Sequence, residues 1–284
     1  MTSHKPVVAV IGTGLIGASV ALALKENGYC SKVLGVGRTA TSVENALKVG
    51  AIDEVLPDCA SAAQADVIML AAPVRAIISH LRELGLCDNR ARLIMDAGSV
   101  KAPIVEAALE SGLGGIFVGG HPMAGSEKSG AVHARADLFE KRTFFIVPTR
   151  EASDKSLEEA ERLVGALGAV PCRIGSKEHD KTVALVSHLP YLAAVTLSEL
   201  AGNSIDSVHA LKKGIAGGFR DVTRIADSSP EMWDDILSLN GANIEEWLDL
   251  LVGSAREIVA KARDNDNLEK LLADIREKRR KLLE

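Results

Sequence analysis

The sequence has few cysteines and no paired arrangement of them. Its four cysteines are scattered along the chain and form no CxxC pair (Cys30, Cys59, Cys87 and Cys172). Zinc sites and disulfide frameworks usually show closely spaced cysteines, and disulfides are rare in cytosolic proteins. The spacing therefore favours reduced thiols in a cytosolic protein over a disulfide-bonded fold or a zinc site.

The sequence also lacks an excess of basic residues, a leader and a long apolar run. Its formal net charge of −5 argues against a nucleic-acid-binding protein, since no basic stripe offsets the acidic residues. Residues 1–6 contain no apolar stretch typical of a signal peptide. We find no internal repeat, and no segment approaches the roughly 20 apolar residues of a membrane-spanning helix. We therefore expect a soluble, cytoplasmic protein that binds neither nucleic acid nor membrane.

The first chemically informative stretch is a glycine motif between a strand and a helix. Val7–Ile11 is a continuous apolar run typical of a buried parallel strand, and a helical pattern follows over residues 18–27. In a GxGxxG motif the glycines allow a tight turn, a close approach of backbone to a pyrophosphate, and close helix–strand packing. We predict that this motif binds a dinucleotide at the helix N-terminus, with a merely structural turn as the alternative. It comprises Gly12, Thr13, Gly14, Leu15, Ile16 and Gly17.

The residues after the second predicted strand bear on the choice of cofactor. An NAD site usually places an acid at the end of this strand to bind the ribose hydroxyls. Here Lys32–Val36 is followed by Gly37, Arg38 and Thr39. Arg38 and the hydroxyl of Thr39 suit a 2′-phosphate, so the sequence favours NADP. The alternative is NAD, with Arg38 stacked on the adenine or in solvent. We also assign Ala72 and Pro73, at the end of a later strand, to the cofactor site.

Strands and helices alternate up to about residue 175, and only helical patterns follow. This order predicts an α/β fold, a doubly wound Rossmann-type sheet whose last strands are antiparallel, followed by an all-helical domain. We place the dinucleotide-binding domain at residues 1–175 and a helical substrate and dimerisation domain at residues 176–284. A long apolar helix is expected over Glu178–Gly202 although it contains Pro190, which suggests a kink beside a site or close helix packing. Broad apolar stripes on the later helices predict a homodimer.

A polar, glycine-rich stretch follows a short predicted strand at residues 115–118. It runs from Gly119 to Gly130 and contains His121, Ser126 and Glu127. Pro122 holds His121 extended, because a proline disfavours the helical conformation of the residue before it. We expect this loop to surround a small ligand, together with the loops after the other parallel strands. A structural role for His121 is the alternative.

Several motifs together resemble one family, the prephenate/arogenate (cyclohexadienyl) dehydrogenases of tyrosine biosynthesis, or TyrA family. The resemblance covers nearly the whole chain. It rests on GTGLIGAS from Gly12, DAGSVK from Asp96, HPMAGSEKSG from His121, SHLP from Ser187, GGFRDVTRIA from Gly217 and PEMW from Pro230.

The resemblance implies an NAD(P)-dependent oxidative decarboxylation of prephenate to 4-hydroxyphenylpyruvate, or of arogenate to tyrosine. It implies that His121 is the general base, that Ser99 orients it and touches the nicotinamide, and that Arg224 binds the ring carboxylate of the substrate. The other residues that it assigns to the substrate pocket are Ser126, Glu127, Asp221, Trp233 and Tyr191. Many prephenate-using members have a histidine where this chain has Tyr191, so prephenate, arogenate or both are possible substrates.

Two rival functions stay open at the level of sequence. One is another Rossmann oxidoreductase with a helical second domain, such as a β-hydroxyacid dehydrogenase or an imine reductase. The other is a nonenzymatic NADP-sensing protein that retains the fold. The presence of His121, Ser99 and Arg224 together favours the dehydrogenase.

Overall fold

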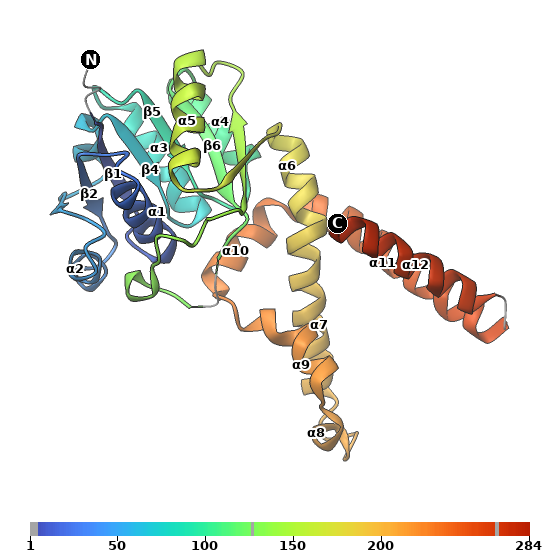
Figure 1. Ribbon diagram of the computed structural model, residues 1–284. Helices are drawn as coiled ribbons and strands as arrows, with labels where there is room; N and C mark the ends of the chain where they lie inside the picture. Colours follow the sequence, from blue (N-terminus) through green and yellow to red (C-terminus); the bar gives the residue numbers. More distant parts are fainter. Residues whose placement is uncertain (1–4, 126–127, 265–266) are drawn as a thin grey trace.

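A computed structural model describes residues 5–125, 128–264 and 267–284, and its core is one eight-stranded sheet (Figure 1). The strand order is β3-β2-β1-β4-β5-β6-β7-β8. The strands β1 to β6 are parallel, β7 is antiparallel to β6, and β8 is parallel to β7. The predicted Rossmann-type fold, including its antiparallel final strands, is confirmed. The strands are β1 (Val7–Ile11), β2 (Lys32–Val36), β3 (Glu54–Val55), β4 (Val67–Leu70), β5 (Leu93–Asp96), β6 (Phe117–Pro122), β7 (Thr143–Pro148) and β8 (Val170–Arg173).

Helices cover both faces of the sheet, which explains why its central strands are apolar on both sides. All four residues of β4 are buried, as expected for a strand between two helical layers. One core cluster packs the sheet against α1, α2 and α5, and the other packs it against α3, α4 and parts of the helical domain. These helices are α1 (Leu15–Glu26), α2 (Ala40–Lys48), α3 (Val74–Gly85), α4 (Ala102–Glu110) and α5 (Asp154–Ala166), and short 3₁₀ turns lie at Ala60–Gln64 and Ala131–His133.

The strand β6 is longer than the sequence analysis predicted. It spans Phe117–Pro122, so His121 lies within a strand and not in the loop after it. The strand β7 causes the extension, because it pairs antiparallel with β6 and places His121 opposite Phe145. The predicted strand at residues 115–118 was therefore wrong in its bounds. As a consequence, the backbone of His121 is fixed by the sheet.

The helical domain begins with one long continuous helix. It consists of α6 (Ser176–Val183), the π-helical turn η3 (Ala184–His188) and α7 (Leu189–Asn203). Pro190 lacks an N–H group and its ring clashes with a preceding carbonyl in a regular α-helix. The wider π turn directly before Pro190 accommodates this clash, and such turns are frequent at functional sites. It also sets the direction of His188 at the end of the turn.

By length and composition, this helix could also cross a membrane. An 18-residue window within Ser176–Asn203 has a mean hydropathy of 1.4, and 33% of that window is buried. The expectation that no segment is apolar and long enough was therefore wrong. A single helix of this kind is weak evidence, because interior helices of soluble proteins have the same composition.

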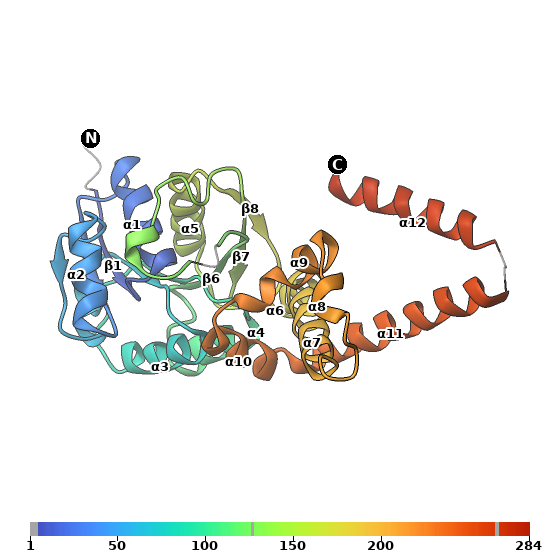
Figure 2. The same cartoon turned by 90° about the horizontal axis from the view of Figure 1, so that it is seen from below.

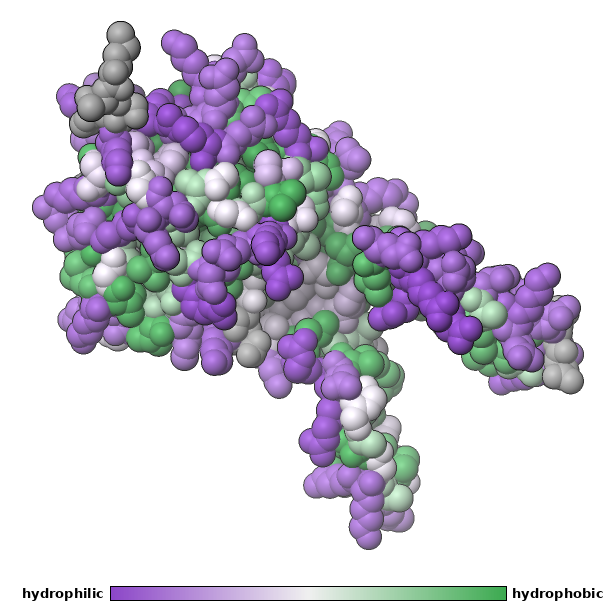
Figure 3. Space-filling model, viewed as in Figure 1, coloured by the Kyte–Doolittle hydropathy of each residue, from purple (hydrophilic) through white to green (hydrophobic). Residues whose placement is uncertain are grey.

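Among the remaining helices, α10 contacts the sheet domain and the last two helices project away from it. The helix α10 packs against α3, whereas α11 and α12 extend away from the sheet domain (Figures 1 and 2). Only Ile244 is buried in α11, and no residue of α12, Leu268–Leu283, is buried. Apolar side chains lie exposed on α7, α11 and α12 (Figure 3), among them Leu200, Leu250 and Leu272. These elements are α8 (Leu211–Gly214), α9 (Gly217–Thr223), η4 (Arg224–Asp227), α10 (Pro230–Leu239), α11 (Gly241–Asp264) and α12 (Leu268–Leu283).

The turn after β1 requires glycine for a steric reason. Gly12 has φ +99°, and a Cβ atom there would lie 2.2 Å from the carbonyl oxygen of Ala71. A Cβ atom at Gly17 would lie 2.0 Å from the carbonyl oxygen of Gly12. The first and third glycines of the motif therefore let β1, β4 and α1 approach one another closely.

We predict that Gly12→Ala destabilises the protein by more than about 1 kcal/mol, because it adds both steric overlap and an unfavourable φ. Thermal unfolding followed by circular dichroism measures the change. Gly165→Ala is the matched control: no atom lies near its Cβ position in α5, and alanine favours a helix. Equal melting temperatures for Gly12→Ala and the wild type would contradict the steric argument.

Candidate active site

The predicted cofactor residues lie together at the carboxyl edge of the sheet. Gly14 precedes α1, whose N-terminus has no side-chain cap, so its first N–H groups are available to an anion. Ala72 and Pro73 follow β4 and lead into α3. The backbone at Gly12 lies close to that at Ala71, which leaves the turn after β1 open to a ligand. This turn, the N-terminus of α1 and residues 72–73 form a dinucleotide cradle. The contacts of these residues with a cofactor stay predictions.

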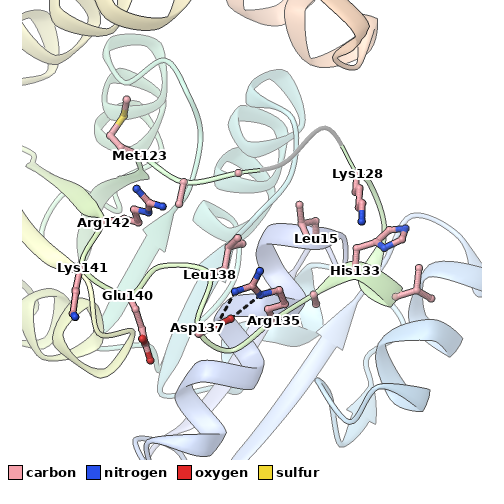
Figure 4. Close-up of a pocket in the computed structure, with 14 residues that line it drawn as sticks. Leu15, Met123, Lys128, His133, Arg135, Asp137, Leu138, Glu140, Lys141 and Arg142 are labelled. Carbon is pink, nitrogen blue, oxygen red and sulfur yellow. Dashed lines mark hydrogen bonds and ion pairs between the residues drawn. The ribbon is translucent and has the colours of Figure 1, made fainter. Parts of the chain in front are cut away.

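A cavity of about 880 Å³ lies beside Leu15, at the start of α1 (Figure 4). Its other side is formed by residues from the segments 123–125 and 128–142, which contribute Lys128, His133, Arg135 and Arg142. Arg135 is paired with Asp137 across the cavity wall. The excess of basic groups near a helix N-terminus gives this part of the sheet edge a positive potential, which favours an anionic ligand.

Arg38 and Thr39, predicted to bind a 2′-phosphate, already have partners in the structure. The exposed guanidinium of Arg38 pairs with the carboxylate of Glu231 in α10. The hydroxyl of Thr39 caps α2 by accepting a hydrogen bond from the main-chain N–H of Ser42 at 3.2 Å. Thr39 therefore has a structural role, and the charge of Arg38 is balanced from the helical domain.

A buried ion pair fixes the backbone around His121. The ammonium of Lys101, which is completely buried, pairs with Asp96 and donates to the carbonyl of Gly120 at 2.8 Å. Asp96 also accepts from the main-chain N–H of Gly120 at 3.0 Å and of Gly98 at 2.7 Å. Burial lowers the pKa of Lys101, and the adjacent Asp96 opposes this shift. The pair joins the ends of β5 and β6.

His121 is connected to a second histidine and a carboxylate. Its Nδ1 atom lies 2.9 Å from Nε2 of His179, and Nδ1 of His179 lies 2.8 Å from the carboxylate of Asp180. Asp180 accepts from the main-chain N–H groups of Lys101 at 2.6 Å and Ala102 at 2.8 Å. These contacts hold the carboxylate at the start of α4.

The hydrogen-bond network determines the tautomer of His121. A carboxylate only accepts, so Nδ1 of His179 carries the proton and its Nε2 accepts when the ring is neutral. His121 then donates from Nδ1, which leaves a lone pair on its Nε2. Burial lowers the pKa of His121 well below 6.5, and the neighbouring His179, Lys101 and His188 lower it further. His121 is thus a neutral imidazole with one basic nitrogen, as a general base requires.

Ser99, predicted to orient His121, lies half-buried in the loop after β5. Its hydroxyl makes no hydrogen bond within the described residues. The partner of His121 in this structure is His179, at the Nδ1 atom. The role of Ser99 stays a prediction.

Aromatic side chains of the helical domain form a cluster around His188. Tyr191 and Trp233 stack with their ring centroids 3.6 Å apart, and His188 meets Trp233 edge-on at 5.9 Å. Asn240 contacts Nδ1 of His188 at 3.0 Å and donates to the carbonyl of Asp180 at 2.8 Å. Burial lowers the pKa of His188 to about 4, so this ring is neutral as well. Trp233 is nearly buried against Tyr191, and its predicted role as a wall of the substrate pocket stays a prediction.

A cavity of about 750 Å³ is lined by three of the predicted substrate residues. It is lined by Tyr191 from α7, and by Asp221 and Arg224 from the segment of α9 and η4. Arg224 is exposed, so its guanidinium is accessible to an anionic group. The predicted substrate residues Ser126 and Glu127 lie outside the described residues.

Known proteins share both domains of this chain. The family model of the prephenate dehydrogenase nucleotide-binding domain matches residues 20–172, and that of the prephenate dehydrogenase dimerization domain matches residues 175–277. The chain belongs to the prephenate dehydrogenase family. Members of this family are nicotinamide-dependent oxidoreductases, which confirms the predicted enzyme class.

Individual relatives agree with the family. The prephenate dehydrogenase of Bacillus subtilis (strain 168) is 35% identical over 257 residues, which cover 87% of this chain and 69% of the relative. A crystal structure of prephenate dehydrogenase from A. aeolicus, in complex with hydroxyphenyl propionate and NAD+, has a TM-score of 0.91 at 30% identity and covers 99% of this chain and 100% of that chain. A crystal structure of Synechocystis arogenate dehydrogenase has a TM-score of 0.82 at 26% identity, covering 97% of this chain and 99% of that chain.

The sequence analysis missed His179 and Asp180. Both lie in a polar stretch that indicates the start of a helix, and nothing local distinguishes them from capping residues. The only available signal was a His-Asp pair directly before the long apolar helix. Their role follows from contacts between distant parts of the chain. His179 contacts His121, 58 positions earlier, and Asp180 contacts Lys101, 79 positions earlier.

We predict that Asp180→Asn lowers kcat by about 100-fold while KM changes little. An amide at this position can donate to Nδ1 of His179, which reverses the tautomers along the pair. Steady-state kinetics measure the effect, and the melting temperature reports whether the fold is retained. Glu178→Gln is the control, since this exposed carboxylate lies in the same helix. A kcat of Asp180→Asn within twofold of the wild type would contradict the network.

We predict that kcat/KM of the wild type stays constant as the pH falls from 7.5 to 6.5. A general base must be unprotonated, and the lowered pKa of His121 keeps it so in this range. The decrease in kcat/KM is expected only below pH 6.5, where the imidazole takes up a proton. An acid-side inflection above pH 6.5 would contradict a buried, neutral His121.

Proposed function

We propose that the protein is a prephenate dehydrogenase of tyrosine biosynthesis, which oxidises and decarboxylates prephenate to 4-hydroxyphenylpyruvate. The observation that carries this proposal is His121, a neutral base fixed in β6 at the same carboxyl edge of the sheet as the glycine motif. The B. subtilis and A. aeolicus relatives with this activity support it.

In the proposed reaction, His121 accepts the proton of the ring hydroxyl through its free Nε2 atom. A bound nicotinamide would supply the hydride acceptor for the carbon that bears this hydroxyl. The bond between the ring and its carboxylate then breaks and releases CO₂, and its electron pair makes the ring aromatic and leaves a phenolate oxygen. The proton on His121 returns to that oxygen. His179 and Asp180 stabilise the transient imidazolium, because the carboxylate is the counter-charge of the pair.

The substrate is held by groups from the helical domain in this proposal. Arg224 binds the ring carboxylate, since a guanidinium forms bidentate hydrogen bonds with a carboxylate. Tyr191 and Trp233 form an apolar wall for the ring, with Asp221 at the cavity edge. We also assign substrate binding to Ser126 and Glu127, and the orientation of His121 to Ser99.

Prephenate is the substrate that we propose, with arogenate as an additional or alternative substrate. The two differ at the end of the side chain, where prephenate has a keto acid and arogenate an ammonium group. Tyr191 occupies the position where many prephenate-using relatives have histidine. The Synechocystis arogenate dehydrogenase, with its similar fold, supports arogenate as the alternative.

We propose NADP as the preferred cofactor, with NAD as the alternative. No acid follows β2, and Arg38 supplies a positive charge for a 2′-phosphate. We also propose a cytoplasmic homodimer, which buries the apolar faces of α7, α11 and α12 between two copies.

We predict that His121→Asn lowers kcat by about 10²- to 10⁴-fold, the usual contribution of a general base. Initial rates with prephenate and arogenate, each with NAD and NADP, measure turnover of the wild type and the variant. Titration with reduced dinucleotide serves as the control, because cofactor affinity is expected to stay within about twofold. Near-normal kcat in the variant would contradict the mechanism, and no turnover in any wild-type combination would contradict the function.

A further inference from the structure

The end of β2 lacks the acidic residue that usually contacts the adenosine ribose. In dinucleotide-binding folds this acid accepts hydrogen bonds from the ribose hydroxyls and repels a 2′-phosphate. Here the strand leads into Gly37, Arg38 and Thr39. A carboxylate is nevertheless present at this place. It belongs to Glu231, which pairs with Arg38 from 193 residues further along the chain.

The position of Glu231 is fixed by the packing of α10 on the dinucleotide-binding domain. Asp235, one turn further along α10, is nearly buried and accepts from the main-chain N–H of Arg75 at 3.0 Å. Asp234 pairs with the Arg75 side chain at 2.6 Å. Trp233 and Ile236 belong to the core cluster on the same side of the sheet. The middle of α10 is therefore attached to the start of α3, next to Ala72 and Pro73, and Glu231 lies one turn before these contacts.

The two side chains of the pair differ in what else they contact. Arg38 and Glu231 are 76% and 57% exposed, and each has only the other as its charged partner among the described residues. A solvent-exposed pair of this kind is weak and exchanges partners readily. The 2′-phosphate of NADP carries a higher charge than a carboxylate, so it can displace Glu231 from Arg38. Breaking the ion pair then reduces the net free energy of NADP binding. NAD, which has a hydroxyl at this position, incurs no such cost.

We propose that Glu231 is a cofactor-specificity residue that weakens NADP binding relative to NAD by competing with the 2′-phosphate for Arg38. This inference rests on the proposed function only in that the chain binds a nicotinamide dinucleotide with its adenosine ribose at the end of β2. It makes α10 of the helical domain part of the adenosine site. The discrimination between the cofactors then depends on both domains.

The test measures dissociation constants of NADPH and NADH by their fluorescence, with the full chain and without substrate. Glu231→Gln keeps the shape of the side chain and removes its charge. The Kd of NADPH is expected to fall by about fivefold, in line with the strength of an exposed ion pair, whereas the Kd of NADH changes less than twofold. The gain is expected to shrink when the ionic strength is raised from 0.05 M to 0.5 M, because salt screens exposed charges.

Two further variants separate competition for Arg38 from a general effect of charge. Asp234→Asn removes an exposed carboxylate from the same helix and is expected to leave the ratio of the two dissociation constants unchanged. In an Arg38→Ala background, Glu231→Gln is expected to change the Kd of NADPH by less than twofold. The melting temperatures of all variants show whether the fold is retained.

Three outcomes would overturn the inference. They are an unchanged NADPH/NADH ratio in Glu231→Gln, an equal change in Asp234→Asn, or a fivefold gain that persists without Arg38. A wild-type chain that binds neither dinucleotide would contradict the proposed function itself. Binding of both dinucleotides without an effect of Glu231 would contradict this inference alone.

Discussion

The buried charge of Lys101 is the constraint on which the rest of the site depends. Its ammonium is held by Asp96 and by the carbonyl of Gly120, and its main-chain N–H binds Asp180. Loss of one partner from a buried ion pair typically costs about 3–5 kcal/mol, because the remaining charge is left without compensation. Lys101 therefore fixes β5, β6, α4 and α6 relative to one another, and His121 is positioned by all four.

The same charge also helps to keep the histidines neutral. Lys101 contributes to the lowered pKa values of His121 and His179, although burial is the larger cause in both. Burial also lowers the pKa of His188, to about 4, and the neighbouring His179 lowers it further. A buried cluster of three histidines beside a lysine cannot hold several charges at once. In the proposed reaction, Asp180 provides the counter-charge that lets His121 accept a proton.

The sequence was sufficient to predict the parts of the fold that are determined locally. Parallel strands and their helices follow one another along the chain, so the fold class and the family were confirmed, and the glycine motif lies between a strand and a helix as predicted. The extent of β6 was not predictable, because Gly119, Gly120 and Pro122 are typical of loops and the strand depends on pairing with β7. The network of His179 and Asp180, and the partner of Arg38, depend on contacts between distant residues. Local sequence patterns do not indicate contacts between residues so far apart in the chain.

The helical domain carries Asp221 and Arg224, which we propose to bind the substrate, on elements without a buried residue. The helix α9 and the turn η4, which contribute Asp221 and Arg224 to the cavity, contain no buried residue within Gly217–Asp227. Both elements pack mainly against α7 and each other, and short helices depend on such packing for their stability. In the proposed dimer, a second copy of the chain covers the exposed apolar side chains of α7, α11 and α12. Because α9 and η4 pack on α7, we expect assembly of this dimer to stabilise the position of Arg224 and so to favour substrate binding.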